Sequence, residues 1–307
     1  MDQLTAETSV LPNFIVVGAS KAGTTSLHHY LSQHPEIFLP GKKESYYFLS
    51  SGLSVNFEGP WEKYTVNRDR TSSWADYLDL FKGSEDFPAR GEVCPSYLRT
   101  PGTAEKVHEK LGDIKIIAML RNPVYRAYSQ YCMRLGLGLE SLGFEEALTA
   151  EPERIKRGWF GGSYFLAGLY GEQLARYYQV YPRENIKVLL YEDFVESPQG
   201  SLTEICDFLG VSSFGNWDTA ERHNKSGDIS NPLLRFLWTK SNTPRGKLRP
   251  FLPAAIRNRA SFWINRLSRS RPTLRQETIT RLLEGYSEDI SACEELTGID
   301  LEHWRRG

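Results

Sequence analysis

Short apolar runs alternate with longer stretches of helical periodicity along the chain. Apolar runs with the length of strands are found at 13–19, 115–120 and 186–191. Stretches that repeat apolar residues with the spacing of amphipathic helices are found at 24–34, 123–135, 164–181 and 201–210. This alternation predicts an α/β fold in which helices flank a central, mainly parallel sheet. We therefore expect a ligand to bind beyond the carboxyl ends of the strands.

Two stretches depart from this alternation. Residues 50–75 are predicted to form an irregular insertion, whereas residues 274–304 return to amphipathic helices. Between Ile229 and Gln276 the chain has no Asp or Glu but 11 Lys and Arg. Three interpretations of this basic segment, 229–276, stay open: a solvated surface around a packed helix, a flap that guides an anionic acceptor, and a helix that lies on a membrane surface.

Composition narrows the class of protein. The 307 residues are predicted to form one domain (1–307) with a flexible N-terminus at 1–12. They include 37 Lys and Arg against 38 Asp and Glu. This balance argues against a general nucleic-acid binder. The four cysteines are scattered without metal-ligand spacing, which argues against a zinc site or a disulfide framework. Without a recognisable signal peptide or a bilayer-length apolar run, we expect a soluble cytoplasmic protein.

The first apolar run leads into a glycine loop. Gly18, Gly23 and Thr25 have the spacing of the phosphate-binding pattern GxxxxGK[ST], but Thr24 stands where that pattern has lysine. The loop's own lysine, Lys21, comes three residues earlier. Main-chain N–H groups at the start of a helix still bind a phosphate oxygen without the usual lysine. We expect an anion site here, with the helix beginning at Thr24 or Thr25.

A second anion site is expected after the apolar run 115–120. Triphosphatases place an acidic ligand for magnesium at such a strand end, but this run leads into Arg121. Asn122 and Pro123 predict a helix start, and Ser129 lies two turns into that helix. Two anion sites without an evident metal indicate a nucleotide with phosphates at two places. A P-loop kinase of small molecules, the rival interpretation, would need a lysine at position 24 and an acid near the strand end.

The two motifs together resemble the sulfotransferases that use 3′-phosphoadenosine 5′-phosphosulfate (PAPS). "GASKAGTTSL" is similar to that family's 5′-phosphosulfate loop, and "IIAMLRNPVYRAYSQY" is similar to its 3′-phosphate motif. "LLYEDF" resembles a further family strand near the adenine, and "KSGD" partly resembles the loop that closes over the nucleotide. The resemblance implies a P-loop-like fold, PAPS as co-substrate and no metal. It implies nucleotide contacts from Lys21, Ala22, Gly23, Thr24, Thr25, Ser26, Arg121, Ser129, Tyr191, Lys225 and Gly227.

A third segment bears on the acceptor. "LPGKKESYYF" resembles the segment that carries the catalytic glutamate in the carbohydrate (heparan-type) branch and in many bacterial members. The resemblance implies that Glu44 is the general base, kept ionised by the neighbouring lysines, and that Lys21 stabilises the leaving group. "ARGEVCPSYL" lacks the histidine that serves as base in the small-molecule branch and offers Glu92 as a reserve base. Contacts to the acceptor are expected from Lys43, Glu92, Tyr97 and Tyr170.

We therefore predict a bacterial, cytoplasmic, PAPS-dependent sulfotransferase with a glycan-like acceptor that offers a hydroxyl or an amine. A non-catalytic nucleotide-binding or membrane-associated module is the alternative from a different class. The sequence leaves the acceptor's identity and the oligomeric state open.

Overall fold

The computed structural model describes residues 11–50, 58–60, 62, 65–219 and 273–306. Most of the predicted flexible N-terminus, Lys225, Gly227 and the basic segment up to residue 272 lie outside the described residues. Predictions about those parts of the chain stay predictions.

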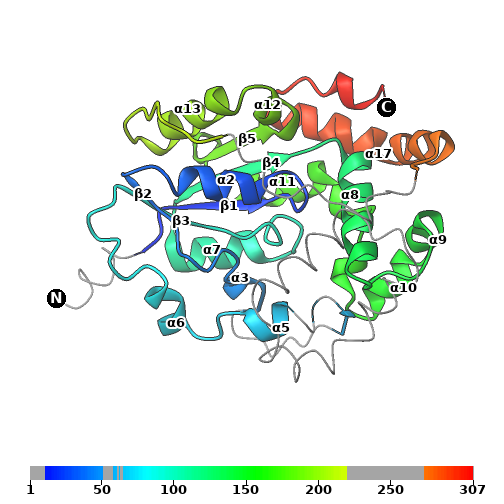
Figure 1. The fold of residues 1–307 in the computed structure, drawn as a ribbon, viewed down its shortest axis with the longest axis horizontal. Helices are drawn as coiled ribbons and strands as arrows, with labels where there is room; N and C mark the ends of the chain where they lie inside the picture. The colour runs from blue at the N-terminus through cyan, green and yellow to red at the C-terminus, as the bar shows by residue number, and fades with distance from the viewer. Residues whose placement is uncertain (1–10, 51–57, 61, 63–64, 220–272, 307) are drawn as a thin grey trace, which may run out of the picture.

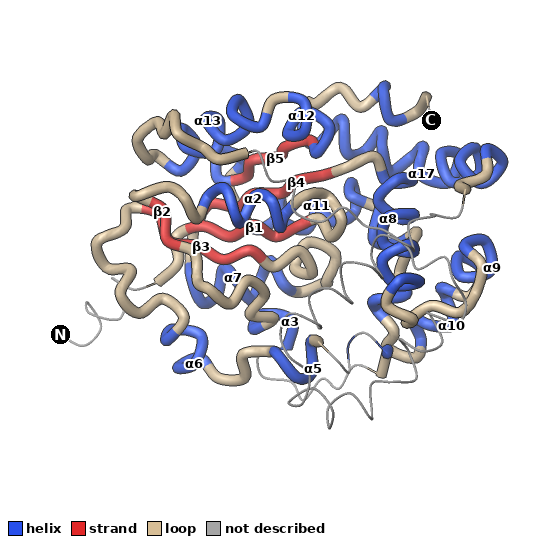
Figure 2. The backbone as a smooth tube through the Cα atoms, viewed as in Figure 1, coloured by secondary structure: helices blue, strands red, loops and turns tan. Residues whose placement is uncertain are grey.

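A five-stranded parallel sheet forms the centre of the described fold (Figure 2). Its strand order is β2-β3-β1-β4-β5. The strands are β1 (Phe14–Gly18), β2 (Ile37–Phe38), β3 (Ala89–Val93), β4 (Lys115–Leu120) and β5 (Ile186–Leu190). Every residue of β1 is buried, as are all residues of β4 after Lys115. Such continuous apolar strands suit a sheet covered on both faces, and the predicted α/β class is confirmed.

Helices cover both faces of the sheet (Figure 1). The longer ones are α2 (Thr24–Leu31), α7 (Thr103–Leu111), α8 (Pro123–Gly136), α11 (Tyr170–Val180), α13 (Pro198–Leu209) and α17 (Gln276–Thr297). The chain crosses from β1 outward to the edge strand β2 through α2, and later crosses from β3 past β1 to β4 through α7. Right-handed crossovers in opposite directions place α2 and α7 on opposite faces. Helix α11 packs against both α7 and α17, so these three share one layer.

Shorter helices lie around this framework. They are α3 (Tyr47–Ser50), α5 (Val66–Asp69), α6 (Trp74–Asp79), α9 (Phe144–Thr149), α10 (Glu151–Lys156) and α12 (Tyr191–Glu196). The prediction that residues 50–75 are irregular is wrong in part, because α5 and the start of α6 fall within that stretch. Helix α6 has a local reason to begin where it does: the Ser73 side chain accepts a hydrogen bond from Asp76 N at 3.0 Å.

Two predicted boundaries also shift. Helix α11 begins at Tyr170, later than the predicted 164, because a 3₁₀ turn at Leu166–Gly168 precedes it. Strand β5 ends at Leu190, and Tyr191 opens α12, whose first turn holds Glu192 and Asp193. Acidic residues favour the first turn of a helix because its N-terminus is electropositive. The aromatic Tyr191 prolonged the apolar run in the sequence and concealed this boundary.

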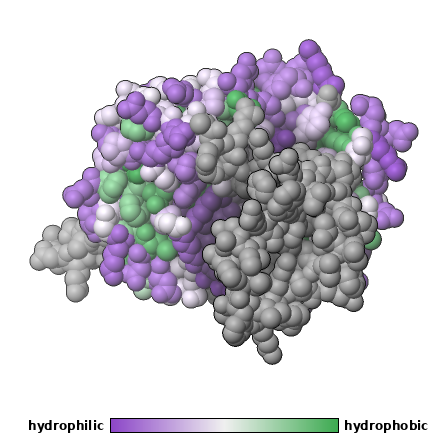
Figure 3. All heavy atoms as spheres, in the orientation of Figure 1, coloured by the Kyte–Doolittle hydropathy of each residue, from purple (hydrophilic) through white to green (hydrophobic). Residues whose placement is uncertain are grey.

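The described surface on the face seen in Figure 1 is mostly hydrophilic (Figure 3). Apolar residues on this face gather only in small areas between polar ones. Among the helices that the structure describes, none combines the length and apolar character needed to cross a bilayer.

The close packing of β1 on β3 generates a stability prediction. Gly91 pairs with Phe14 in the parallel register, and a Cβ atom at Gly91 would come within 2.5 Å of the Phe14 ring. We expect Gly91→Ala to lower the free energy of unfolding by about 1–3 kcal/mol, the usual cost of overpacking a core. Urea denaturation measures this change. Gly215→Ala is the control, because a Cβ there meets nothing within 4 Å, and an equal loss in both variants would contradict the packing argument.

Candidate active site

A cavity of about 690 Å³ lies beyond the carboxyl ends of the parallel strands. Residues that follow four different strands line it: Lys21 after β1, Ser96 after β3, Arg121 after β4 and Tyr191 after β5. The structure thus brings together most of the residues that the sequence nominated. Those that line this cavity are Lys21, Gly23, Thr24, Thr25, Ser26, Lys43, Glu44, Arg121, Ser129 and Tyr191.

The glycine loop opens α2 without a side-chain cap. Gly23 occupies the N-cap position with φ 88°, no side chain caps the helix, and its first turn has no acidic residue. The main-chain N–H groups at this end therefore remain available to an anion. The helix starts at Thr24, as predicted. Glycine suits the N-cap position both for its positive φ and because a Cβ would come within 2.9 Å of the Tyr191 ring.

Arg121 connects the loop with the end of β5. Its Nη1 donates a hydrogen bond to the Lys21 carbonyl oxygen at 3.2 Å, and its guanidinium lies 4.5 Å from the centre of the Tyr191 ring. The next residue, Asn122, caps α8 by accepting a hydrogen bond from Val124 N at 3.0 Å. The predicted helix start after Arg121 is therefore confirmed.

Lys21 extends from the loop towards α8. Its Nζ lies 3.4 Å from Sδ of Met133, one helical turn beyond Ser129. Its backbone is left-handed, with φ 73°, a conformation that non-glycine residues rarely adopt. Tyr46, also on the cavity wall, shares this feature with φ 55°. Such backbone conformations concentrate at functional sites, where the surrounding structure enforces them.

Glu44 is held by two neighbours on its own loop. Lys43 Nζ donates to Oε1 at 3.0 Å, and the Tyr46 hydroxyl donates to Oε2. Lys42 instead donates to Thr71 Oγ1 at 3.2 Å, so only one of the two adjacent lysines pairs directly with the carboxylate. A second hollow of about 580 Å³ also has Lys43, Glu44 and Tyr46 in its wall, together with residues around α5. Glu44 therefore lies where the two hollows meet.

Glu92 lies in the core and not beside the cavity, where a reserve base was expected. It is 1% exposed and does not line the cavity. Its Oε2 accepts a hydrogen bond from Ser45 Oγ at 2.7 Å, and its Oε1 accepts from the hydroxyls of Tyr77 at 2.9 Å and Tyr97 at 3.1 Å. Burial raises the pKa of Glu92 to about 7, although these hydrogen bonds oppose the shift. The carboxyl group therefore anchors the loop that carries Glu44 from behind.

Three other predicted contacts are also absent from the cavity wall. Tyr97 is fully buried in the Glu92 cluster, and Tyr170 is buried with its hydroxyl donating to the Arg121 carbonyl oxygen at 3.0 Å. Ala22, within the glycine loop, is also fully buried. Tyr97 and Tyr170 therefore support the site from within the core and do not line the cavity.

The structure adds residues that the sequence analysis missed. Those that line the cavity include Ser20, Tyr46, Ser96, Arg99, Gln130, Met133 and Arg134. Helical spacing from Ser129 was the available signal for Met133, because a residue four positions on lies on the same face of the helix. Gln130 and Arg134 form a second pair with that spacing, on a neighbouring part of the helix surface. Arg99 gave no comparable local signal. Within the described residues, no group of three or more His, Cys, Asp or Glu side chains could hold a metal ion.

The chain is similar to known proteins in both sequence and structure. The profile of the sulfotransferase family matches residues 12–215. The crystal structure of a sulfotransferase from Alicyclobacillus acidocaldarius is 31% identical, with a TM-score of 0.75 that covers 96% of this chain and 99% of that one.

Three curated proteins are similar over shorter shares of their own length. The membrane-associated sulfotransferase kil1 of Dictyostelium discoideum is 27% identical over 73% of this chain and 61% of its own. Human heparan sulfate glucosamine 3-O-sulfotransferase 6 is 28% identical over 65% of this chain and 52% of its own. The bovine bifunctional heparan sulfate N-deacetylase/N-sulfotransferase 2 is 27% identical over 70% of this chain and 24% of its own. The chain thus spans from about a quarter to three fifths of these relatives.

The buried carboxyl group of Glu92 generates a pH prediction. Since its pKa is raised from 4.5 to about 7 on folding, the folded state holds the proton more tightly. The free energy of unfolding should therefore fall as pH rises through this interval. We expect Glu92→Gln to remove that fall, as measured by urea denaturation at about pH 5 and about pH 8. Glu184→Gln, which removes an exposed carboxylate, is the matched control. A wild-type pH dependence in Glu92→Gln would contradict the assignment.

Proposed function

This chain belongs to the sulfotransferase family, and from that premise we propose that it moves a sulfuryl group from PAPS to a hydroxyl or amine of a carbohydrate-like acceptor. The observation that carries the proposal is the shared cavity. The loop with Lys21, the pair Arg121 and Ser129, and the carboxylate of Glu44 all line its wall. This set of groups suits a donor with anionic groups at two places and an acceptor that must lose a proton.

The cavity fits the proposed donor in size and charge. Its volume of about 690 Å³ lies within the roughly 300–1,000 Å³ of typical small-molecule sites. The uncapped N-terminus of α2 and Lys21 would hold the 5′ end, while Arg121 and Ser129 would hold the 3′-phosphate. The Tyr191 ring, which already lies against Arg121, offers an aromatic surface for the adenine. When bound, PAPS supplies the activated sulfuryl group.

Two side chains carry the proposed chemistry. Lys21 stabilises the negative charge that develops on the oxygen next to the 5′-phosphate. Glu44 accepts the proton of the attacking hydroxyl or amine. Hydrogen bonds from Lys43 and Tyr46 fix the carboxylate, which faces the donor cavity on one side and the second hollow on the other. An acceptor that enters through the second hollow would therefore reach Glu44 without displacing the donor.

Two observations support a carbohydrate acceptor. The loop with Glu44 resembles that of the heparan-type branch, and two of the similar curated proteins are named for heparan sulfate. Their names include an O-sulfotransferase and an N-sulfotransferase, so our proposal keeps both a hydroxyl and an amine as acceptor groups.

Thermal stabilisation by nucleotides distinguishes this proposal from a P-loop kinase. We expect 3′,5′-bisphosphoadenosine, the spent donor, to raise the melting temperature without magnesium, because Arg121 and Lys21 neutralise its phosphates. At 100 times its Kd a ligand stabilises the folded state by about 2.7 kcal/mol. ATP with magnesium should do little, and differential scanning fluorimetry measures both shifts. The reverse pattern would favour the kinase.

Kinetics test the two catalytic roles. With radiolabelled PAPS at saturation, Lys21→Ala should lower kcat on the order of 10²-fold or more, the scale for a lost transition-state donor. Glu44→Gln keeps the shape of the side chain but cannot accept the proton, and should lower kcat by roughly 10²- to 10⁴-fold. Lys82→Ala and Glu184→Gln change exposed residues elsewhere and serve as matched controls. Unchanged turnover in either site variant would remove that residue from the mechanism.

A further inference from the structure

A buried carboxyl group behind the loop of the general base has no task in the proposed chemistry. Glu92 belongs to β3 and is almost fully buried. It contacts three hydroxyl groups, those of Ser45, Tyr77 and Tyr97, whose side chains are buried with it. An ionised carboxylate is costly to remove from water. The surrounding contacts therefore decide whether Glu92 keeps its proton.

The protons in this cluster can be counted from four contacts between oxygen atoms. Ser45 Oγ lies 2.7 Å from Glu92 Oε2. The hydroxyls of Tyr77 and Tyr97 lie 2.9 and 3.1 Å from Glu92 Oε1. The fourth contact joins Ser45 Oγ to the Tyr97 hydroxyl at 2.9 Å, and either atom can be its donor. Each contact needs a proton between its oxygens, and each of the three hydroxyls supplies only one.

A proton on Glu92 supplies the missing one. Glu92, Ser45 and Tyr97 then form a closed hydrogen-bonded cycle, in which each group donates to the next in one sense or the other. Tyr77 donates to the carboxyl group from outside the cycle. With Glu92 ionised, all three hydroxyls donate to the carboxylate, and no proton remains for the contact between Ser45 and Tyr97. The geometry thus favours the neutral acid.

Main-chain N–H groups do not alter this count, because each brings its own proton. Tyr47 N donates to Ser45 Oγ at 3.2 Å, and Phe48 N donates to the Tyr97 hydroxyl at 3.3 Å. Tyr47 and Phe48 are the first residues of α3, which follows the loop with Glu44. The cycle is therefore fastened to the chain just after the general base.

The titratable groups around Glu92 come from three segments. They are Tyr77 of α6, Cys94 and Tyr97 after β3, and Glu44 next to Ser45. Strand β1 presents the apolar Ile15 opposite Glu92 in the parallel register. Burial raises the pKa of Cys94, and the charges of Glu92 and Glu44 raise it further, so the two carboxyl groups share one neighbourhood. Burial likewise raises the pKa of Glu92 to about 7, in agreement with the proton count.

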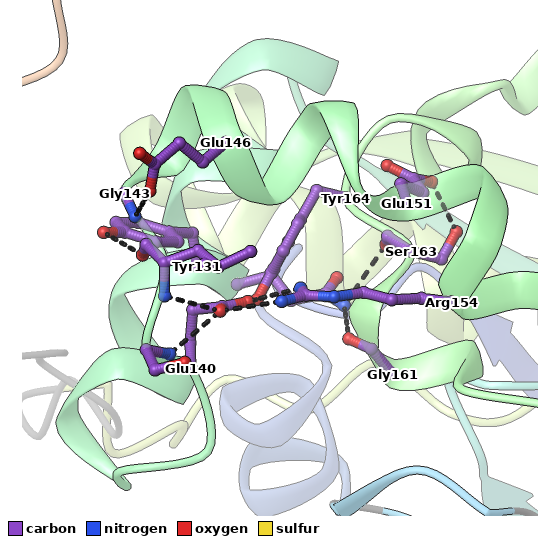
Figure 4. Close-up of polar contacts among 12 residues, drawn as sticks. Tyr131, Glu140, Gly143, Glu146, Glu151, Arg154, Gly161, Ser163 and Tyr164 are labelled. Atoms are coloured by element: carbon purple, nitrogen blue, oxygen red, sulfur yellow. Dashed lines mark hydrogen bonds and ion pairs between the residues drawn. The ribbon is translucent and has the colours of Figure 1, made fainter. Parts of the chain in front are cut away.

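The buried Glu140 shows the contrasting case (Figure 4). Arg154 donates two hydrogen bonds to its carboxylate, at 2.6 and 2.9 Å, and Tyr164 donates another at 2.8 Å. Burial opposes ionisation, yet these hydrogen bonds keep the pKa of Glu140 below its ordinary value. Hydroxyl groups stabilise a negative charge less than a guanidinium does. Glu92, with hydroxyl partners, is therefore the carboxyl group of the two that holds a proton near neutral pH.

Ser45 connects the cycle with the general base. It follows Glu44 directly, its side chain belongs to the cycle, and its carbonyl oxygen accepts a hydrogen bond from Thr71 N at 2.7 Å. The next residue, Tyr46, donates to Glu44 from a left-handed backbone position. A change in the cycle would therefore displace main-chain atoms that place both Glu44 and its hydrogen-bond donor.

We propose that Glu92 is a neutral carboxylic acid in the active enzyme and a positioning residue for Glu44, acting through Ser45. When the pH rises, Glu92 releases its proton to solvent and the cycle opens. The Ser45 and Tyr97 oxygens then repel each other, and the loop with Glu44 shifts. The inference rests on the proposed function and adds that catalysis needs one glutamate ionised and a second one neutral.

Infrared spectroscopy tests the protonation state without any substrate. A neutral carboxylic acid has a C=O stretching band that is separate from the bands of carboxylates. In the difference between wild type and Glu92→Gln we expect this band at about pH 6, where exposed carboxyl groups are ionised, and its loss by about pH 8.5. Glu184→Gln removes an exposed carboxylate and should leave the band in place. Absence of the band at the lower pH would overturn the proposal.

Kinetics test the positioning role, with PAPS at saturation and N-acetylated heparosan as an acceptor that offers hydroxyls without a free amine. Above about pH 7, wild-type kcat/KM for the acceptor should fall by up to about tenfold per pH unit. Glu92→Gln stays neutral at every pH, and its amide both donates and accepts hydrogen bonds, so this fall should disappear. An unchanged fall, or an equal loss of activity at every pH, would contradict the positioning role.

Tyr77→Phe keeps the role testable if Glu92→Gln fails to fold. Tyr77 does not line the cavity, and its hydrogen bond to Glu92 favours the carboxylate. Its loss should move the fall in kcat/KM to higher pH by about one unit. Tyr177→Phe is the matched control, because it removes a buried hydroxyl that has no hydrogen-bond partner among the described residues. An unshifted profile in Tyr77→Phe, or an equal shift in the control, would count against the proposal.

Failure of this inference differs from failure of the proposed function. No sulfuryl transfer at any pH, together with no shift in melting temperature with 3′,5′-bisphosphoadenosine, would count against the proposed function. The infrared band would still report the state of Glu92. Transfer whose pH profile responds to neither Glu92→Gln nor Tyr77→Phe would overturn the positioning role alone.

Discussion

Parallel pairing of β1 with β3 on one side and β4 on the other is the constraint on which the rest of the structure depends. Parallel strands bring their carboxyl ends to one edge of the sheet, whatever the length of chain between them. At this edge the loop with Lys21, the segment with Arg99 and the arginine after β4 meet around one cavity. The same constraint brings Tyr191, at the end of β5, against Gly23.

Contacts at this edge hold the loop in an uncommon shape. Arg121 binds the Lys21 carbonyl oxygen and lies over the Tyr191 ring, so one side chain links three strand ends. Lys21 and Tyr46 keep left-handed backbones that an isolated peptide would rarely adopt. The structure around them over-determines these conformations and directs both side chains to the site.

Two glutamates close to each other in space have different environments and different tasks. Glu44 is partly exposed between two hollows and receives hydrogen bonds from Lys43 and Tyr46. Glu92 is buried, with a pKa raised by desolvation, and binds Ser45, the residue next to Glu44. The core therefore holds the Glu44 loop through a carboxyl group that does not itself line the cavity. Arg99 and Arg134 also line this cavity.

The sequence by itself determined the fold class and the motifs of the donor site. Apolar runs, the glycine loop, and Arg121 followed by Asn122 and Pro123 are local patterns, because strand burial, helix capping and main-chain anion binding depend on near neighbours. The boundary at Tyr191 escaped this reasoning, since an aromatic residue suits both a strand end and a helix start.

Only the tertiary structure decided which residues share the cavity. Glu92, Tyr97 and Tyr170 were predicted, like Lys43, to contact the acceptor, yet packing places these three in the core. Arg99 carried no local signal at all, because its environment is built by residues far away in the chain. Burial and charge balance depend on how distant segments pack, and no pattern of neighbouring residues encodes them.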